Sequence, residues 1–197
     1  MNLPNKLTIA RIFMAICVLI ILIFPWAQVG FNWSVFTVAG KVIVDLRYIV
    51  CGVIFIIAAF TDFLDGNIAR KQNLVTDFGK TMDAIADKIL VNGLLIVLAN
   101  DGFISVIIPV VIITRDIITD SVKMVSGSKG KVIAASWLGK AKTACMMVGV
   151  ALVLFYNLPF ELININLGNV LIVIATVLSV VSGCQYYIVN KDIFADK

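Results

Sequence analysis

The sequence predicts an all-α integral membrane protein that forms a single domain over residues 1–197. Of its 197 residues, 61% are hydrophobic and only 14% are charged, which is less polar surface than a soluble domain of this length carries. The mean hydropathy is +1.05, and the apolar residues fall in runs that approach the ~20 residues needed to cross a bilayer as helix. We therefore expect six transmembrane helices preceded by an N-terminal interfacial helix.

The first expected element is the interfacial helix NLPNKLTIAR, with Pro4 in its first turn. The apolar run that follows it is short, but it lacks a small-x-small cleavage site and further runs follow. We therefore interpret it as a retained span and not as a signal peptide. The loop over residues 29–45 receives no functional assignment. The six expected spans cover residues 12–26, 48–62, 79–99, 103–124, 138–156 and 169–189.

Basic residues are distributed unevenly between the two sides of these spans. One set of loops carries only Lys41 and Arg47. By the positive-inside rule the other side, with both termini, faces the cytoplasm, so we expect a multi-pass protein of the cytoplasmic membrane. The basic residues on that side are Lys6, Arg11, Arg70, Lys71, Lys80, Lys123, Lys129, Lys131, Lys140, Lys142, Lys191 and Lys197.

Several kinds of chemistry are excluded by composition. The chain contains no histidine, so histidine bases, histidine metal ligands and Ser-His-Asp triads are ruled out. Its four cysteines are isolated within apolar runs and form no C-x-x-C pair, which indicates neither a zinc site nor a disulfide framework. The net charge of +4 is modest, and no nucleic-acid-binding module is present.

Four aspartates recur at helical spacing in DFLDGNIARKQNLVTDFGKTMDAIADK. Asp62 and Asp65 are three residues apart, and Asp83 and Asp87 are four apart, so each pair shares one face of a helix. Asp83 and Asp87 would lie ~6 Å and ~12 Å inside a helix that begins near Gly79. A carboxylate at such depth costs roughly 2.5–3.5 kcal/mol unless something satisfies it, so this segment opens toward a ligand or a counter-ion.

Two helices that each present a carboxylate pair can satisfy one another through shared cations. Carboxylates without histidine or cysteine suit Mg²⁺ or Mn²⁺, and four of them can hold two ions about 4 Å apart, as in phosphoryl-type displacements. Between the pairs, Gly66 and Ala69 leave room and Arg70 offers a planar fork for phosphate oxygens. For each aspartate taken singly, a structural ion pair with a base such as Lys80 or Lys88 remains the alternative.

The pattern D-x2-D-G-x2-A-R-x8-G-x3-D-x3-D resembles the signature of the CDP-alcohol phosphatidyltransferases at all eight fixed positions. The resemblance implies six transmembrane helices, a homodimer, and transfer of a phosphatidyl group from a CDP-linked lipid to an alcohol, with two divalent metals and release of CMP. It implies that Asp62, Asp65 and Asp83 are metal ligands. It implies that Asp87 is both a metal ligand and the general base. The implied CDP-binding positions are Gly66, Ala69, Arg70 and Gly79.

Spans four and five carry basic residues that suit an anionic acceptor. Arg115, in TRDIITDSVK, lies ~13 Å from the cytoplasmic end, close to the depth expected for Asp87. A deep arginine beside a metal site can hold the phosphate of the acceptor, and Asp116 either orients Arg115 or pairs with a lysine. Lys140 and Lys142, in SWLGKAKT, point in roughly opposite directions on an ideal helix. Either their flexible stems converge on the phosphate or one of them is only a membrane anchor.

SWLGKAKT, the Arg115–Asp116 pair and NLPNKLTIAR together resemble one branch of the family, whose acceptor is sn-glycerol 3-phosphate. That branch carries Glu where Asp116 stands, which leaves the detailed orientation of Arg115 open. The resemblance also implies that Asn5, Thr8 and Arg11 line the entrance for the nucleotide lipid. Helix capping and interfacial anchoring are the alternative roles of these three residues.

The expected reaction therefore joins CDP-diacylglycerol to the C1 hydroxyl of sn-glycerol 3-phosphate, giving phosphatidylglycerophosphate and CMP. A sibling transferase that uses inositol phosphate, phosphatidylglycerol or serine is the alternative, although the basic residues of spans four and five weigh against serine and phosphatidylglycerol. A cation transporter with the aspartates as its ion site is a further alternative, but the chain lacks the inverted repeat typical of transporters. A non-catalytic scaffold bound to its lipid is the third.

Overall fold

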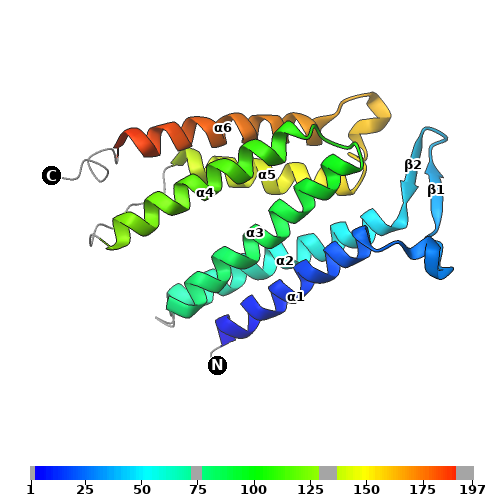
Figure 1. Ribbon diagram of the computed structural model, residues 1–197. Coiled ribbons are helices and arrows are strands. Elements are labelled where there is room, and N and C mark those ends of the chain that lie inside the picture. The colour runs from blue at the N-terminus through cyan, green and yellow to red at the C-terminus, as the bar shows by residue number, and fades with distance from the viewer. Residues whose placement is uncertain (1–2, 72–76, 129–136, 190–197) are drawn as a thin grey trace.

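The computed structural model describes residues 3–71, 77–128 and 137–189. In these residues, long α-helices lie lengthwise in an antiparallel bundle (Figure 1). They range from 18 to 26 residues, which is ~27–39 Å at the rise of an α-helix and comparable with the ~30 Å hydrocarbon core of a bilayer. The helices are α1 (Leu3–Ile23), α2 (Leu46–Lys71), α3 (Asp77–Asn100), α4 (Ile107–Ser128), α5 (Trp137–Leu154) and α6 (Leu167–Val189).

Four of these helices, α1, α2, α5 and α6, contain a stretch that is long and apolar enough to cross a membrane. Helices α3 and α4 have similar lengths of 24 and 22 residues, but acidic and basic side chains interrupt their apolar runs. A mostly helical membrane protein is therefore confirmed. The predicted number of six crossings depends on α3 and α4.

Two predicted features of the first 45 residues differ from the structure. Helix α1 runs without a break from Leu3 to Ile23, so NLPNKLTIAR leads directly into the first apolar run and is not a separate element. The loop over residues 29–45 is not without structure, because it contains the antiparallel strands β1 (Val35–Val38) and β2 (Val42–Asp45). Valine, threonine and isoleucine favour strands, and Gly40 accepts the positive φ of 66° in the turn between them.

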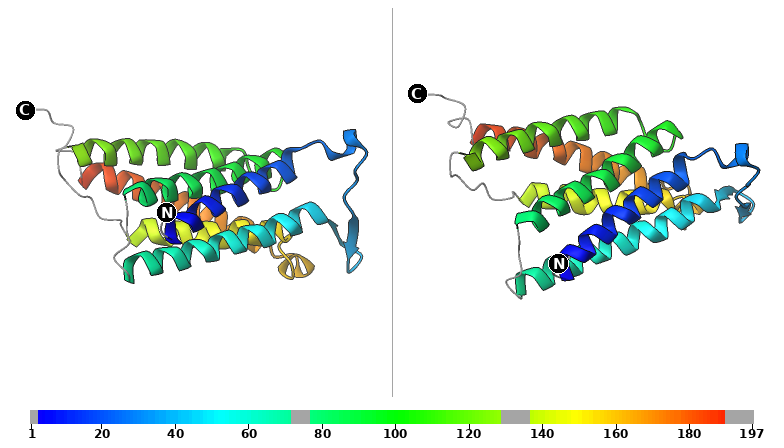
Figure 2. Two further views of the ribbon diagram at one scale, coloured as in Figure 1. Left: turned by 90° about the horizontal axis from the view of Figure 1, so that it is seen from below. Right: turned by 60° about the horizontal axis from the view of Figure 1, so that its bottom comes forward.

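The bundle consists of two groups of three helices. In the first group α1 packs along both α2 and α3, and in the second α6 packs along both α5 and α4. Contacts of α2 with α5 and of α3 with α4 join the two groups, and Figure 2 shows the same arrangement from two further directions. Leu90, Leu94, Leu95 and Leu98 of α3 are almost fully buried at the centre of the core. Helix α3 is thus the central helix, and its other face is free to carry polar groups.

Helices α5 and α6 approach each other closely at two glycines. A Cβ atom on Gly149 would lie 2.7 Å from Cγ1 of Ile172 and 3.1 Å from the carbonyl oxygen of Gly168. A Cβ atom on Gly168 would in turn lie 3.3 Å from the carbonyl oxygen of Gly149. Small residues allow such close backbone packing between membrane helices, where burial from water contributes little to association. This contact fixes α5, and with it the basic residues at its beginning.

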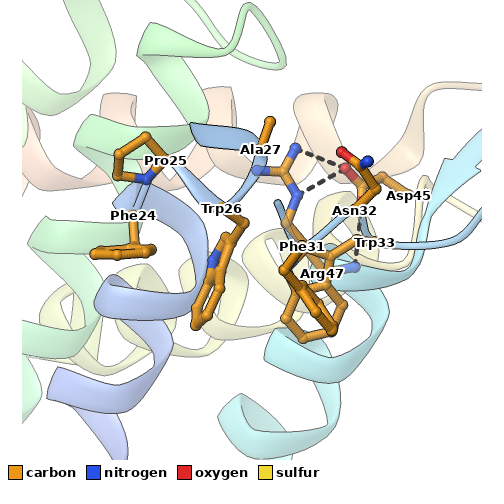
Figure 3. A pocket seen from close by; sticks show the side chains of 9 residues that line it. All are labelled: Phe24, Pro25, Trp26, Ala27, Phe31, Asn32, Trp33, Asp45 and Arg47. Atoms are coloured by element: carbon orange, nitrogen blue, oxygen red, sulfur yellow. Dashed lines mark hydrogen bonds and ion pairs between the residues drawn. The ribbon is translucent and has the colours of Figure 1, made fainter. Parts of the chain in front are cut away.

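The hairpin end of the bundle holds an aromatic cluster. Trp26, Phe31 and Trp33 meet edge to face around a cavity of about 260 Å³ (Figure 3). Beside them Arg47 Nη2 lies 2.6 Å from Asp45 Oδ2, and the backbone N–H of Asp45 donates to the hydroxyl of a tyrosine at the end of α5. Aromatic residues of this kind concentrate where a membrane meets water. We interpret this end as the interfacial anchor of the bundle.

Candidate active site

The predicted site residues gather at the end of the bundle opposite the hairpin. The beginnings of α1, α3 and α5 and the ends of α2 and α4 lie at that end (Figure 1). The antiparallel order of the helices produces this arrangement, since each connection returns the chain to one end or the other. Residues that are far apart in the sequence are thereby brought to a common level.

Helix α1 contributes directly to the aspartate cluster. Arg11, only 2% exposed, places Nη1 2.5 Å from Oδ1 of Asp62 and 3.7 Å from Oδ1 of Asp83. Thr8, also 2% exposed, donates a hydrogen bond of 2.6 Å to the same oxygen of Asp83. Asn5 lies one turn earlier on α1. Three helices therefore share one polar cluster, with the basic group buried behind the acidic ones.

The described carboxylates of this cluster suit hard divalent cations. Oδ1 of Asp62 and Oδ1 of Asp83 both lie near Nη1 of Arg11, so these two oxygens are no more than about 6 Å apart. The side chains of Asp62 and Asp83 are 53% and 41% exposed, which leaves each an open face away from Arg11. Oxygen-only ligands are those that Mg²⁺ and Mn²⁺ prefer, and a cationic group already lies among them. The residues present therefore fit the metals that the sequence predicts.

Some of the predicted positions lie outside the described side chains. The backbone of α2 is described at Asp65, Ala69 and Arg70, but the side chains of these residues are not. Among the side chains that the structure does describe, no three acidic groups come together closely enough to hold a metal ion. Gly79 is buried in the first turn of α3, and Gly66 is half-buried in α2. The four-carboxylate site thus remains a prediction that depends on Asp65.

Asp87 occupies the space between two charged groups of residues. Asp87 is exposed as a whole residue, and its carboxylate forms no hydrogen bond or ion pair with any other described side chain. The charges that act on it come from Asp62 and Arg11 on one side and from Lys142 and Asp116 on the other. Asp87 is therefore the link between the aspartate cluster and the basic residues of α4 and α5. An acidic group with no partner among the described side chains is available to accept a proton.

A small cavity of about 40 Å³ opens beside Asp87, between α3, α4 and α5. Apolar side chains from all three helices close part of its wall. The cavity is small enough to fit closely around a group of a few atoms. The polar residues that line it are Asp87, Lys88 and Asn92 from α3, Asp116 from α4, and Lys142 and Thr143 from α5.

Two cations converge on one carboxylate oxygen of Asp116; Asp116 and Lys142 line this cavity, whereas Arg115 does not. Nη1 of Arg115 lies 3.0 Å from Oδ1 of Asp116, and Nζ of Lys142 lies 2.9 Å from the same atom. Asp116 therefore contacts both Arg115 and a lysine, so the two predicted alternatives do not exclude each other. An oxygen of a phosphate that took the place of this carboxylate oxygen would meet the same two donors. The pair is arranged as a clamp for an anion.

The remaining donors of Arg115 are directed at α6. Nε donates to the carbonyl oxygen of Ser179 at 3.0 Å, and Nη2 donates to the hydroxyl of Ser182 at 2.7 Å. Gly183 makes this approach possible, because a Cβ atom there would lie 3.1 Å from Cγ of Arg115. The guanidinium is thus fixed in position before any ligand arrives. Lys140, in contrast, is exposed and does not line the cavity, so the structure brings only one of the two lysines of α5 to it.

The alternative of simple ion pairing has a mixed outcome. Lys88 pairs with Asp120 of α4 and not with its neighbour Asp87. Asp62 and Asp83 do have a basic partner, but it is Arg11 from α1. The side chain of Lys80 lies outside the described residues. The interpretation that local lysines neutralise the aspartates is therefore not borne out by Lys88.

Sequence reasoning missed two residues of the cavity, Asn92 and Thr143. Asn92 follows Lys88 by one turn on α3, and the amide forms no hydrogen bond with another described residue. Thr143 donates to the carbonyl oxygen of Gly139 within α5. The signal for Asn92 was present, since an asparagine inside the apolar run ILVNGLLIVLA is costly unless it meets a partner.

Comparison with known proteins agrees with this arrangement. The family model for CDP-alcohol phosphatidyltransferase matches residues 1–181. A Bacillus subtilis protein called CDP-diacylglycerol–glycerol-3-phosphate 3-phosphatidyltransferase is 38% identical over 189 residues, covering 96% of this chain and 95% of its own length. Proteins of the same name from Mycoplasma pneumoniae and Rickettsia bellii are 37% and 32% identical, covering 85% and 98% of this chain and 74% and 97% of their own lengths. The chain therefore belongs to the CDP-alcohol phosphatidyltransferase family.

Proposed function

We propose that the protein transfers the phosphatidyl group of CDP-diacylglycerol to the C1 hydroxyl of sn-glycerol 3-phosphate, giving phosphatidylglycerophosphate and CMP. The observation that carries this proposal is the position of Asp87. It lies between the cluster of Asp62 and Asp83 and the anion clamp of Arg115 and Lys142. The relatives from Bacillus subtilis and Rickettsia bellii align with nearly the full length of this chain, and their names state the same donor and acceptor.

Asp62, Asp65, Asp83 and Asp87 are the residues we propose for two divalent cations, Mg²⁺ or Mn²⁺. The fit rests on the oxygen-only donor set and on the open faces of Asp62 and Asp83. Metal bound there supplies positive charge to the pyrophosphate of the donor and to the departing CMP. The packing of α2 and α3 on α1 fixes the positions of these aspartates, and the aspartates determine where the metal charge would lie.

The nucleotide end of the donor is proposed to lie over the beginning of α3 and the end of α2. Gly66, Ala69 and Gly79 leave room for it there, and Arg70 offers donors to a phosphate. Asn5 and Thr8 close the same space from α1, and Thr8 already contacts Asp83. The two acyl chains remain in the bilayer beside the apolar, exposed outer faces of the helices.

The phosphate group of the acceptor is proposed to enter the cavity between α3, α4 and α5. This phosphate displaces the carboxylate of Asp116 from Arg115 and Lys142, which then hold it with charge-assisted hydrogen bonds. Lys140, exposed two residues before Lys142, draws the anion toward the cavity and does not hold it. The amide of Asn92, which forms no hydrogen bond with another described residue, is placed to bind a hydroxyl of the glycerol.

In the chemical step Asp87 accepts the proton of the C1 hydroxyl. The oxygen attacks the phosphorus atom on the lipid side of the pyrophosphate, a new P–O bond forms, and the P–O bond to CMP breaks. Arg115 and Lys142 hold the acceptor so that its hydroxyl faces Asp87, and the apolar wall of the cavity limits access of water. Water would otherwise compete with the alcohol for the donor.

The membrane arrangement is proposed to comprise six crossings, with both termini and the active site on the cytoplasmic side. Helices α3 and α4 have sufficient length, and the charged residues that break their apolar runs belong to the proposed site. The beginning of α1, from Leu3 to about Arg11, lies at the level of the headgroups. The family resemblance also supports a homodimer.

The test is release of CMP by the purified protein in detergent with CDP-diacylglycerol and Mg²⁺. Glycerol 3-phosphate, inositol phosphate, serine and phosphatidylglycerol are compared as acceptors. We expect release with glycerol 3-phosphate and not with the others. Release with a different acceptor would keep the chemistry and overturn the assignment of the cavity, and release with none would overturn the proposed function.

A further inference from the structure

Arg11 is a permanent positive charge in the interior of the aspartate cluster. Its guanidinium is 2% exposed and lies between carboxylates from two helices, at 2.5 Å from Asp62 of α2 and 3.7 Å from Asp83 of α3. An arginine does not lose its proton in a protein, so this charge is present in every state of the enzyme. The guanidinium therefore lies close to the place proposed for the metals.

We infer that Arg11 is a resident cation of the metal site, which holds the carboxylates of α2 and α3 together while no metal is bound. The inference rests on the proposed function in that it takes the aspartates to be metal ligands. Arg11 is a positioning residue in this account and does not touch the reacting atoms. Its consequence is a site that keeps its shape between turnovers.

Helix packing explains why such a residue is needed. The main contacts of α2 and α3 among the described residues are with α1 and not with each other. Carboxylates on α2 and α3 repel one another across this gap when nothing positive lies between them. Arg11 reaches the gap from α1, the helix that both of them touch, and Thr8 adds a hydrogen bond to Asp83 from the same face. One side chain thus joins three helices.

The competing explanation is that Arg11 merely fills space in the core. The two explanations differ in how they depend on metal. If Arg11 substitutes for a missing cation, Mg²⁺ compensates for its loss, and the unfolding temperature of a variant without it depends more strongly on Mg²⁺ than that of the wild type. If Arg11 only fills space, Mg²⁺ leaves the deficit unchanged.

The experiment is thermal unfolding of the full-length protein in detergent, in EDTA and again in saturating Mg²⁺. In EDTA we expect Arg11→Gln to unfold several °C below the wild type, because two half-exposed carboxylates lose the buried cation that lies between them. In Mg²⁺ most of this difference should disappear. Arg11→Lys, which keeps the charge, should lose less than half as much in EDTA. An equal deficit in both conditions, or none in EDTA, would overturn the inference.

Arg47→Gln is the matched control. It removes an arginine from an ion pair with Asp45 at the opposite end of the bundle, where Figure 3 shows the contact. Its deficit should be the same in EDTA and in Mg²⁺. A deficit that Mg²⁺ removes there as well would mean that the metal acts on the whole fold, and it would overturn the inference.

A second variant keeps the test decisive where Arg11→Gln does not fold in EDTA. Adding Asp62→Asn removes one of the two carboxylates that contact Arg11 among the described side chains, so the double variant should fold in EDTA. If the double variant also failed to fold in EDTA, the proposed role of Arg11 in neutralising the carboxylates would be contradicted. These readouts need neither CDP-diacylglycerol nor an acceptor. A protein that behaves as expected here but transfers nothing would therefore overturn the proposed function and leave the role of Arg11 intact.

Discussion

At the scale of single residues, the site depends on which carboxylates have partners and which do not. Asp62 and Asp83 contact Arg11, and Asp116 contacts Arg115 and Lys142. Asp87, between these groups, has no such contact within the described part of the chain. An acid that is already paired is a poor base, because accepting a proton would cost its ion pair. Asp62, Asp83 and Asp87 are all proposed metal ligands, and the difference in described partners supports only the additional role of Asp87 as the base.

Replacing Asp87 by asparagine should abolish turnover while the fold persists. The amide is nearly isosteric but cannot accept the proton of the hydroxyl, and general-base catalysis contributes about 10²–10⁴-fold to a rate. We expect CMP release to fall by at least about 100-fold. Asp101→Asn is the control, since Asp101 lies at the hairpin end and accepts a hydrogen bond from Tyr48 that an amide oxygen also accepts. Normal turnover by Asp87→Asn would refute the base assignment.

Lys142 and Lys140 should differ sharply when each is replaced by methionine. Only Lys142 lines the cavity and contacts Asp116, and a hydrogen bond to a charged group contributes about 1.5–3 kcal/mol. Lys142→Met should raise KM for glycerol 3-phosphate about 10- to 100-fold. Lys140→Met should raise it less than about threefold, an effect that salt reduces because it acts at long range. An equal rise in KM for the two variants in steady-state kinetics would contradict the assignment of Lys142, and not Lys140, to the cavity.

At the scale of elements, the helices were predicted more completely than their ends or their partners. Periodicity and length located all six apolar runs, and spacing placed each aspartate pair on one helix face. The contact of Arg11 with Asp62 joins residues of two helices, and the hydrogen bond from Thr8 to Asp83 spans 75 residues, so neither leaves a local pattern in the sequence. The sequence predicts a separate interfacial helix over NLPNKLTIAR, yet helix α1 continues through it, and Arg11 contacts Asp62 and Asp83 inside the bundle.

The choice between Lys140 and Lys142 also depends on contacts between helices, which local sequence does not reveal. The sequence established that two lysines spaced two residues apart on a helix diverge. Which of them faces the site depends on the rotation of α5, and that rotation is set by its glycine contact with α6. The hairpin was missed for a different reason. Its strands are only four residues each, and a short apolar run between two spans gives a weak signal.

The glycine contact between α5 and α6 should be sensitive to one added methyl group. Gly149→Ala would bring a Cβ atom within 2.7 Å of Ile172 and 3.1 Å of a backbone oxygen, which the helices can relieve only by moving apart. Overpacking of this kind costs about 1–3 kcal/mol, or roughly 2–12 °C in unfolding temperature for a chain of this size. Gly127→Ala on α4 meets no atom within 4 Å and should cause no loss. Equal unfolding temperatures of the two variants would contradict the close packing.

At the scale of the whole molecule, the two ends of the bundle are chemically different. One end holds the aspartate cluster, the anion clamp and most of the basic residues that the structure describes. The other holds the hairpin and the aromatic cluster of Trp26, Phe31 and Trp33, with Arg47 paired to Asp45. Soluble nucleotide and glycerol phosphate are cytoplasmic compounds, so a transferase of this family needs its polar end on that side. Charge asymmetry and chemistry therefore call for the same orientation.

This orientation can be tested by labelling with a membrane-impermeant maleimide in intact cells. The four native cysteines are first replaced, and single cysteines are then introduced by Lys41→Cys, at the turn of the hairpin, and by Lys123→Cys, near the end of α4. Both positions are exposed, so a difference in labelling reports the side of the membrane and not burial. We expect Lys41→Cys to be labelled in intact cells and Lys123→Cys only after permeabilisation. The reverse pattern would place the proposed site outside the cell, away from its substrates, and would refute the topology even if the purified enzyme remained active.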